Sequence, residues 1–502
     1  MQESTYPQTK RTNLTYGLLA VFSAVLILGG FFRLYNLGSQ SYWMDEGYTI
    51  NAVKAIQEKG STILDSGLPY FCPMYCYPTA LISNALGASP TSYRLLSVLT
   101  GLAFIVAMFF ITRKLFNQNV AMLTSVALTF SYWQIAWSRQ ARWYTLFALF
   151  FWVALYFFHQ SLYGEKNRAW HGIFAVVFTI FAIMTHGLGY LLPLIFIGWI
   201  LIDRIFLGKK MNFGYLIKVI STIVVLATIS LVFLSQKFGI HYELPYYVSF
   251  YIRAYWLFLI FLIIGFFAIT HSMKREMYFL LFVLLSYLIP LSFLTNIVHY
   301  RYLFHVTPVF ILLGTAGMLA INDNLKNNYT KSSFWIVLTI LFFTIGGGVF
   351  IPRTEYFLES DNPETIGERP SYAYTPQPDW NAAYEFLEIN REEGDIVISS
   401  QPQFTKIFLN DPGYWIKYDY LGFADQVKEP TGDTEYYVGA KVIDDLQELQ
   451  VIASSAHGFV IFDHMSADGK IAENIISYIR DNFKLVFEKK TNPWSEVWIY
   501  KF

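Results

Sequence analysis

Charged residues and cysteines are scarce in this chain. Only 14% of its 502 residues are charged, basic and acidic residues balance to a net charge of zero, and the two cysteines are Cys72 and Cys76. A neutral chain offers no electrostatic basis for binding nucleic acid. Two cysteines are too few for a disulfide scaffold and lack the further ligands of a zinc site. The C-terminal part has no Gly-rich phosphate loop, which argues against nucleotide binding there.

Hydrophobic residues make up 55% of the chain and aromatic residues 19%, and the mean hydropathy is +0.38. Uncharged runs of 18 residues or more predict membrane-spanning helices. The longest run, residues 169–202, is interrupted by Thr185-His-Gly-Leu-Gly189, which predicts two helices joined by a tight turn. We therefore expect a polytopic α-helical membrane protein with about 11 spans, in these runs: 12–32, 95–112, 115–138, 143–164, 169–202 (two spans), 219–236, 254–273, 277–300, 302–322 and 332–352.

The bias of lysine and arginine between alternate loops predicts the orientation. One set of loops holds most of these residues, and the opposite short loops hold isolated arginines. The rich set is expected to be cytoplasmic, with the N-terminus inside and the eleventh span exiting outward. No small-residue cleavage site follows the first span, so it reads as a retained helix rather than a signal peptide. The integral membrane protein would then carry its C-terminal domain outside the cytoplasm.

The chain changes character near residue 352, which divides it into a membrane part, residues 1–351, and a tail, residues 352–502. The tail begins with a Pro-rich linker and then alternates helical and strand patterns. Helices are expected at 379–390, 443–456 and 471–483, and strands at 395–399, 458–462, 484–489 and 495–500, the last two forming a hairpin. These patterns predict a small extracytoplasmic α/β domain.

The first outer loop, residues 33–94, is the longest connection between spans and contains two short helical patterns, at 48–58 and 74–86. Asp45 and Glu46 immediately precede the first of them. Adjacent acids just outside a bilayer are candidates for a reaction centre. They are equally the residues that a helix dipole favours in a first turn.

Five short motifs resemble those of the GT-C glycosyltransferases, and most of all the dolichyl-phosphate-mannose protein mannosyltransferase-like and aminoarabinose-transferase-like enzymes. All five lie on the predicted outer side, and the resemblance covers the membrane part. The motifs are Trp43-Met-Asp-Glu46, Tyr93-Arg-Leu-Leu-Ser-Val-Leu-Thr-Gly101, Ser138-Arg-Gln-Ala-Arg-Trp-Tyr144, Thr185-His-Gly187 and His299-Tyr-Arg-Tyr302 followed by Pro308.

The resemblance implies that a sugar moves, with inversion, from a polyprenyl phosphate (undecaprenyl or dolichyl phosphate) to the hydroxyl of a protein, glycan or lipid acceptor. A phosphate leaves as an anion, so one carboxylate suffices as the base. We assign this role to Asp45, with Glu46 positioning the acceptor or a metal ion. If a divalent metal takes part, Asp45 is also the best oxygen ligand for it.

The leaving phosphate requires cationic donors, and arginines at predicted outer helix ends have the matching geometry. Arg94, Arg142 and Arg301 are the substrate-binding candidates, with Arg139 as a weaker one. Each is also explained as an interfacial arginine. Three further residues are candidate substrate contacts that have structural or interfacial explanations: Tyr144, His186 and Tyr302.

The chain departs from these relatives in two places. Residues 71–78 lack the His-Pro-Pro element common among them, and Gln140 stands where many carry an acid; Asp65 or Glu243 are possible substitutes. The spacing of Cys72 and Cys76 permits a disulfide without requiring one. Two other classes stay open. One is a polytopic transporter, although the spans carry no Asp, Glu, Lys or Arg and show no repeat, and the other is a non-catalytic scaffold with an outer binding domain.

Overall fold

The computed structural model describes residues 8–204, 244–268, 274–293, 299–344, 378–416, 434–443, 445–468, 471–490 and 495–502. The chain forms two compact units. The first comprises Met1–Leu34, Val98–Ser138 and Trp143–Pro352, and the second comprises Tyr35–Ser97, Arg139–Arg142 and Arg353–Phe502. The second unit thus groups the first outer loop with the C-terminal part, a grouping that no sequence pattern indicates.

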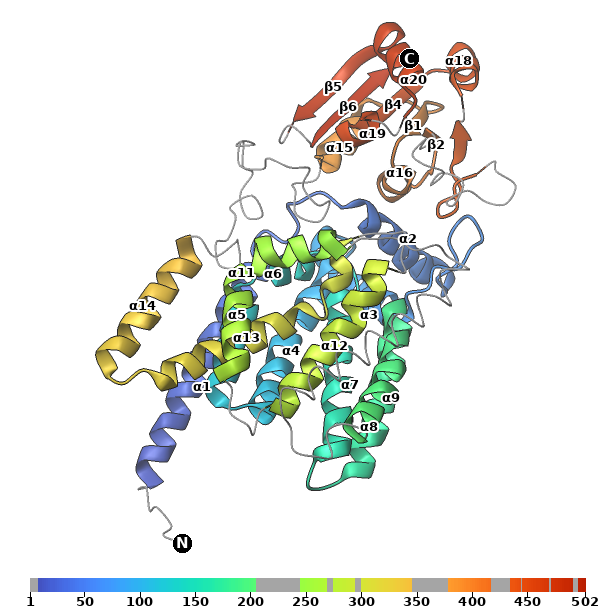
Figure 1. Ribbon diagram of the computed structural model, residues 1–502. Helices are drawn as coiled ribbons and strands as arrows, with labels where there is room; N and C mark the ends of the chain where they lie inside the picture. The colour runs from blue at the N-terminus through green and yellow to red at the C-terminus, as the bar shows by residue number, and fades with distance from the viewer. Residues whose placement is uncertain are drawn as a thin grey trace. The chain divides into compact units, whose positions relative to one another are not determined.

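The first unit is helical (Figure 1). Its described elements, of which α4 begins in the second unit, are α1 (Gln8–Leu34), α4 (Pro90–Leu115), α5 (Gln118–Phe130), α6 (Tyr132–Ser138), α7 (Tyr144–Tyr163), α8 (Arg168–Thr185), η1 (Gly187–Tyr190), α9 (Leu191–Ile202), α11 (Leu244–Ala268), α12 (Lys274–Phe293), η4 (Tyr300–Leu303), α13 (Thr307–Asn324) and α14 (Asn328–Thr344).

Each uncharged run that falls on described residues is helical, and the turn expected within residues 169–202 is present as η1. Among the described residues, four helices are long and apolar enough to cross a membrane, and a bent pair within α11 would make a fifth. The run at 219–236 lies outside the described residues, so the count of eleven spans stays a prediction.

The run at 115–138 differs from the expected single helix. It breaks at Ser131, where φ is −62° and ψ is 116°, between α5 and α6. The α11 helix also departs from helical geometry, at Tyr255. The Ser131 hydroxyl and the Tyr255 hydroxyl lie 3.2 Å apart in a hydrogen bond. Such polar side chains stabilise broken helices where lipid offers no hydrogen-bond partners.

Small residues bring α11 and α13 close together. A Cβ added at Gly265 or Gly317 would overlap the backbone of the facing helix. Without a hydrophobic force between helices in lipid, close backbone approach of this kind is a main source of packing energy.

The C-terminal part of the second unit is built on a six-stranded sheet with strand order β3-β2-β1-β4-β6-β5 (Figure 1). The first four strands in this order pair in parallel, and β6 pairs antiparallel with β4 and β5. The strands are β1 (Ile396–Ser399), β2 (Tyr414–Ile416), β3 (Lys441–Ile443), β4 (Gly458–Asp463), β5 (Lys484–Lys490) and β6 (Glu496–Lys501).

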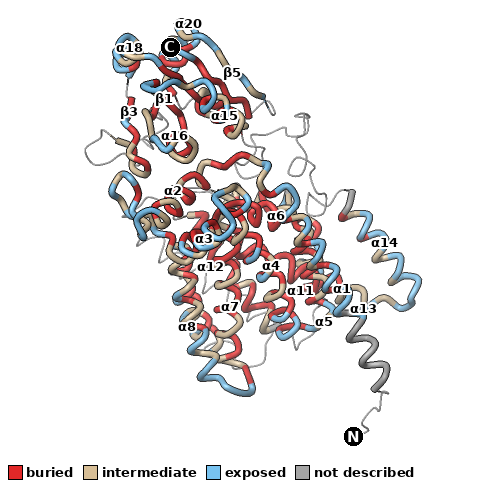
Figure 2. Tube along the Cα trace, turned by 180° about the vertical axis from the view of Figure 1, so that it is seen from behind, coloured by how far each residue is buried: buried red, intermediate tan, exposed pale blue. Residues whose placement is uncertain are grey.

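Helices cover the sheet, as its buried central strands require. Residues of α18 (Leu446–Ser455) and α20 (Glu473–Asn482) share a buried cluster with Val460 and Phe462 of β4. The helix α15 (Trp380–Asn390) contacts β5 and β6, and α16 (Pro402–Leu409) contacts β1. A single turn, α19 (His464–Ala467), follows β4. Burial is continuous along the central strands (Figure 2).

Most of the predicted elements of the tail are present, including the closing hairpin of β5 and β6. The helix expected from residue 443 begins at Leu446, because Ile443 ends the strand β3 and Asp445 caps the helix. The sequence patterns missed α16, β2 and β3, which are short. In the first outer loop, both expected helices are present as α2 (Met44–Lys59) and α3 (Pro73–Leu86).

Candidate active site

The acidic pair lies in the first turn of α2. Glu46 is the third residue of the helix, and its Oε2 accepts the N–H of Trp43 at 3.0 Å, so it caps the helix that it belongs to. Asp45 lies beside it, where the positive end of the helix dipole favours a carboxylate. The first-turn explanation therefore applies to this pair, and the reaction-centre explanation stays a prediction.

Glu46 is completely enclosed by hydrogen-bond donors. Its Oε1 accepts Arg94 Nε at 2.8 Å and the N–H of Ala141 at 2.6 Å, and its Oε2 accepts Arg94 Nη2 at 2.9 Å as well as the Trp43 amide. The side chains of Glu46 and Arg94 are each 1% exposed. With four bonds made, the carboxylate is fully occupied in this arrangement.

Arg94 is equally occupied. Besides its two bonds to Glu46, it donates Nη1 hydrogens to the carbonyls of Leu37 and Gln40 and an Nη2 hydrogen to the carbonyl of Ser41. These contacts use all five N–H groups of the guanidinium. The expectation that Arg94 binds the leaving phosphate therefore has no support in this geometry, which makes Arg94 the anchor of Glu46 and of the chain before α2.

Asp45 is the more accessible acid, with 14% of its side chain exposed. Its Oδ2 lies 3.4 Å from Arg142 Nη2. Arg142 also donates Nη1 to the Asp45 carbonyl at 3.0 Å, to Thr49 Oγ1 at 2.9 Å and to the Tyr70 hydroxyl at 2.8 Å. The structure thus brings the partly exposed Asp45 carboxylate and the Arg142 guanidinium together at the start of α2.

The short segment 139–142, which contains Arg142, also contacts the start of the first outer loop. Arg139 donates to the carbonyls of Tyr35 at 2.6 Å and Asn36 at 3.0 Å, and the Gln140 carbonyl accepts the Arg142 N–H at 2.7 Å. Arg139 is buried, with 2% exposed. Its contacts make it a support for the backbone.

Four of the expected substrate contacts lie in the first unit. The His186 ring centroid is 5.7 Å from that of Tyr144 and 6.1 Å from that of Tyr302, and the Arg301 guanidinium lies over the Tyr302 ring at 5.6 Å. His186 Nδ1 accepts the N–H of Leu188 at 3.1 Å, which caps η1 and fixes the ring. These four side chains therefore form one cluster, and their role as substrate contacts stays a prediction.

Sequence reasoning missed three residues near Asp45. Tyr48, Tyr70 and Tyr437 pack together, with ring centroids 4.1 Å apart for Tyr48 and Tyr437 and 6.0 Å apart for Tyr70 and Tyr437. Tyr437 comes from the C-terminal part, nearly four hundred positions from Asp45. No local sequence signal indicates such a contact.

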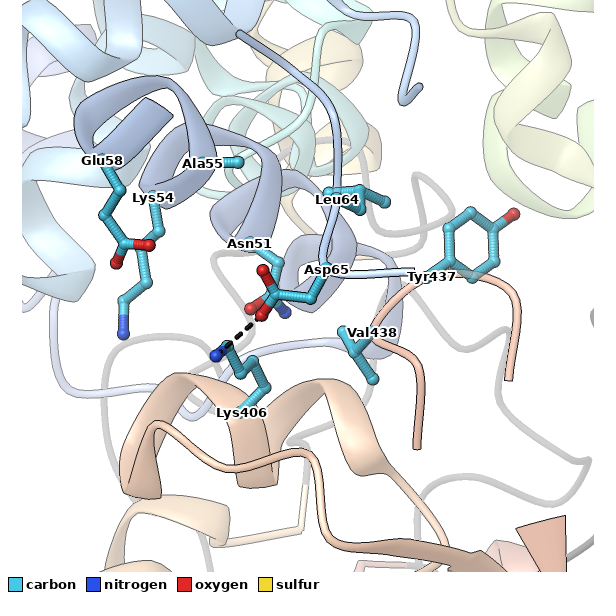
Figure 3. A pocket seen from close by; sticks show the side chains of 9 residues that line it. All are labelled: Asn51, Lys54, Ala55, Glu58, Leu64, Asp65, Lys406, Tyr437 and Val438. Carbon is cyan, nitrogen blue, oxygen red and sulfur yellow. Dashed lines mark ion pairs between the residues drawn. The ribbon is translucent and has the colours of Figure 1, made fainter. Parts of the chain in front are cut away.

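A small pocket beside α2 is shown in Figure 3. Asp65, one proposed substitute for the second acid, contacts Lys406 at its edge at 2.7 Å, and it also contacts Lys59 at 2.7 Å. The cavity volume of about 10 Å³ is room for roughly one water molecule, so the pocket cannot hold a sugar. Glu243, the other proposed substitute, lies outside the described residues. The pocket is lined by Asn51, Lys54, Ala55, Glu58, Leu64, Asp65, Lys406, Tyr437 and Val438.

A metal ion would find few protein ligands among the described residues. These contain no group of three or more His, Cys, Asp or Glu side chains placed to hold one. Because the Glu46 oxygens already accept four bonds, Asp45 is the carboxylate left at this end of α2. An ion held there would depend on Asp45 together with water or phosphate oxygens, as magnesium sites commonly do.

The two cysteines form a disulfide at the start of α3, between Cys72 and Cys76, with their Cα atoms 5.4 Å apart. The sequence left this pairing open. A bonded pair is typical of proteins exposed to an oxidising compartment.

The first unit also contains an apolar cavity of about 180 Å³ between α5, α11, α13 and α14. Its lining carries no acidic or basic side chain. It therefore suits an apolar ligand rather than the chemistry of transfer.

Comparison with known proteins connects this geometry to a known architecture. Residues 69–233 match the profile of a family described as dolichyl-phosphate-mannose-protein mannosyltransferase. The structure of ArnT from Cupriavidus metallidurans in the apo state is similar, with a TM-score of 0.60 and 14% identity over 97% of this chain and 98% of that chain. ArnT bound to undecaprenyl phosphate gives the same values. This chain has the GT-C glycosyltransferase fold.

The GT-C fold also relates the chain to AglB, the archaeal oligosaccharyltransferase from Archaeoglobus fulgidus, solved in complex with an inhibitory peptide and a dolichol-phosphate. The TM-score is 0.57 at 11% identity, over 90% of this chain and 70% of that chain. No curated protein sequence matches this chain. The resemblance inferred from the motifs is thus confirmed at the level of the fold, and the long apolar helices among the described residues agree with an integral membrane protein.

The family match covers Arg94, Arg142, Tyr144 and His186, whereas Asp45 and Glu46 precede it. The assignment of the acids therefore depends on the contacts described above and not on the matched segment.

Proposed function

We propose that this protein is an inverting glycosyltransferase that moves a sugar from a polyprenyl phosphate to an acceptor hydroxyl on the extracytoplasmic face of a membrane. The observation that carries the proposal is the accessible Asp45 carboxylate, paired with Arg142 at the start of α2 in a chain with the GT-C fold. The undecaprenyl phosphate bound by ArnT and the dolichol-phosphate bound by AglB support a polyprenyl-phosphate donor.

The chemistry requires one base and one cation. Asp45 Oδ takes the proton of the acceptor hydroxyl, and the acceptor oxygen forms a bond to the anomeric carbon. The bond between that carbon and the phosphate oxygen breaks, and its electron pair leaves with the polyprenyl phosphate. Because the leaving group is an anion, no second carboxyl group is needed to protonate it, unlike in glycosidases.

Glu46 and Arg94 act in this proposal as positioning residues. Their two-bond contact fixes the first turn of α2, and thereby the direction of Asp45. Fixed geometry of this kind contributes strongly to catalysis, because small displacements of a base are costly. Arg142 and Arg301 are the cations proposed to stabilise the departing phosphate.

The outer location of this chemistry is part of the proposal. Two observations support it: the lysine and arginine bias favours a first loop outside the cytoplasm, and the disulfide between Cys72 and Cys76 within that loop agrees with an oxidising environment.

The experiment that tests the proposal follows sugar release by the full-length protein in lipid nanodiscs. Undecaprenyl and dolichyl phosphates carrying radiolabelled mannose or a pentose serve as donors, and a membrane extract supplies acceptors. We expect Asp45→Asn to lower kcat by about 10²- to 10⁴-fold, the contribution of a positioned base. Asp411→Asn is the matched control, because Asp411 is half exposed and contacts Arg391 far along the chain.

Both variants should keep the unfolding temperature of the wild type. Full transfer by Asp45→Asn would refute the base assignment. If the wild type released no sugar from any of these donors, the glycosyltransferase proposal would fail and a non-catalytic binding role would be favoured.

A further inference from the structure

A tight turn in the C-terminal part, residues 434–440, is organised by one buried acid. Glu435 Oε2 accepts the N–H of Tyr437 at 3.0 Å and of Val438 at 2.7 Å. The Glu435 backbone also bonds with Ala440 and Gly439, which closes the turn. The side chain is 2% exposed, and its Oε1 is buried without a hydrogen-bond partner among the described residues. Leaving a buried acid oxygen without a hydrogen bond costs free energy of folding, so such a group calls for a functional explanation.

The turn delivers Tyr437 to the first outer loop. Its ring packs on Tyr48 with an interplanar angle of 34° and meets Tyr70 edge-on at 76°. Tyr48 lies one helical turn after Asp45 on α2, and Tyr70 accepts a hydrogen bond from Arg142, which pairs with Asp45. Of the two neighbours of Tyr437, Tyr48 is therefore on the same helix as the proposed base and Tyr70 is linked to it through Arg142.

We propose that Glu435 is a positioning residue of the sugar-transfer centre: by closing the turn at 434–440 it holds Tyr437 against Tyr48 and Tyr70, and so fixes Asp45 and Arg142. This inference rests on the proposed function for its catalytic consequence, but the contact itself can be measured without any substrate. In this proposal, residues of the C-terminal part help to position the groups that carry out the sugar transfer.

The environment of Glu435 gives the arrangement a pH dependence. Burial raises the pKa of Glu435 to about 7, against the opposing effect of the backbone N–H groups that its Oε2 accepts. The titratable groups of this contact are Tyr48, Tyr70, Tyr437 and Asp45, of which Tyr48 and Tyr437 interact electrostatically with Glu435. Arg142 is the cation of the same contact and is hydrogen-bonded to Tyr70.

Burial disfavours the charged form of Glu435, and this decides whether the closed turn gains or loses stability as the pH rises. A pKa raised in the folded state means that the proton on Glu435 stabilises the closed turn below pH 7. As the pH rises through 7, the carboxyl becomes a buried anion and the closed turn loses stability. The contact of Tyr437 with Tyr48 and Tyr70 is therefore tighter at pH 6 than at pH 8.

Glu435→Gln keeps the hydrogen bonds that close the turn but removes the group that titrates. The glutamine carbonyl oxygen still accepts both N–H bonds but cannot become an anion. Glu388→Gln is the matched control, because Glu388 is exposed on α15. In the wild type and the control we expect kcat to fall between pH 6 and pH 8, whereas in Glu435→Gln this fall is absent. Tyr437→Ala should lower kcat by roughly 2- to 10-fold at pH 6, the effect of losing one packed aromatic pair.

Hydrogen exchange on the full-length protein without substrate gives the second measurement. Amide exchange at residues 434–443 and at the start of α2 should rise from pH 6 to pH 8 in the wild type, after correction for intrinsic rates, but not in Glu435→Gln. If Glu435→Gln shared both the kinetic pH profile and the exchange pattern of the wild type, the positioning role would be refuted. If the wild type were inactive, the proposed function would fail while the exchange data still decided whether Glu435 controls the turn.

Discussion

Arg94 and Glu46 form a two-point contact between α4 and α2, with Nε to Oε1 at 2.8 Å and Nη2 to Oε2 at 2.9 Å, and both side chains are buried. Parallel N–H···O bonds of this kind fix orientation as well as distance. The contact explains how the first outer loop can hold Asp45, the proposed catalytic carboxylate, in a fixed position.

Breaking this contact should destabilise the protein more than it alters the chemistry. A buried ion pair that loses one member leaves an uncompensated charge, at a cost of about 3–5 kcal/mol. We expect Arg94→Met to lower the unfolding temperature markedly in a thermal melt of the detergent-solubilised protein. Adding Glu46→Leu to Arg94→Met should recover part of the loss, since the orphaned charge is then gone. A double variant less stable than Arg94→Met alone would contradict this account.

Replacing Arg142 by lysine preserves the positive charge, and we expect it to lower the rate of sugar transfer all the same. Lysine cannot reproduce the fork that reaches Asp45, Thr49 and Tyr70 together. We expect Arg142→Lys to lower kcat by roughly 30- to 1000-fold, with a small change in unfolding temperature. Arg480→Lys, on the exposed face of α20, is the control. Wild-type kcat in Arg142→Lys would show that the fork has no role in transfer.

Replacing Gly47 or Gly172 by alanine should change the stability of the protein in opposite directions. A Cβ at Gly47 would lie 2.5 Å from Gln403 Cγ and 3.0 Å from the Phe404 ring of α16, whereas at Gly172 the nearest atom is 3.9 Å away. Gly47→Ala should cost about 1–3 kcal/mol of stability through overpacking. Gly172→Ala should gain up to about 1 kcal/mol from helix propensity. Thermal melts of the two variants test this, and equal shifts would mean that α16 does not pack tightly on α2.

The disulfide provides a test of orientation. Cys72 and Cys76 are the two cysteines of the chain, so thiol labelling reports on the first loop alone. In intact cells, a membrane-impermeant maleimide should label them only after reduction. A Glu165→Cys change in a Cys72→Ser/Cys76→Ser background should label only after the membrane is permeabilised, because that loop is expected to be cytoplasmic. Labelling of Glu165→Cys in intact cells would reverse the predicted orientation.

Local sequence patterns were informative wherever the physical cause is local. The apolar runs predicted the helices of the first unit, and the alternation of residues 484–500 predicted the β5–β6 hairpin, because hydrophobic period and turn chemistry act over short distances. The break at Ser131 was missed because its partner, Tyr255, lies on another helix.

The sequence by itself determined that the chain is a helical membrane protein with an α/β tail and an acidic pair after the first span. Composition and periodicity record burial, and burial drives both choices. Only the tertiary structure decided that the two acids differ. Glu46 is used up by Arg94 and backbone amides, while Asp45 stays reachable beside Arg142. It also brought Glu435 and Tyr437 to the same helix, since contacts between residues far apart in the chain depend on packing that no local pattern encodes.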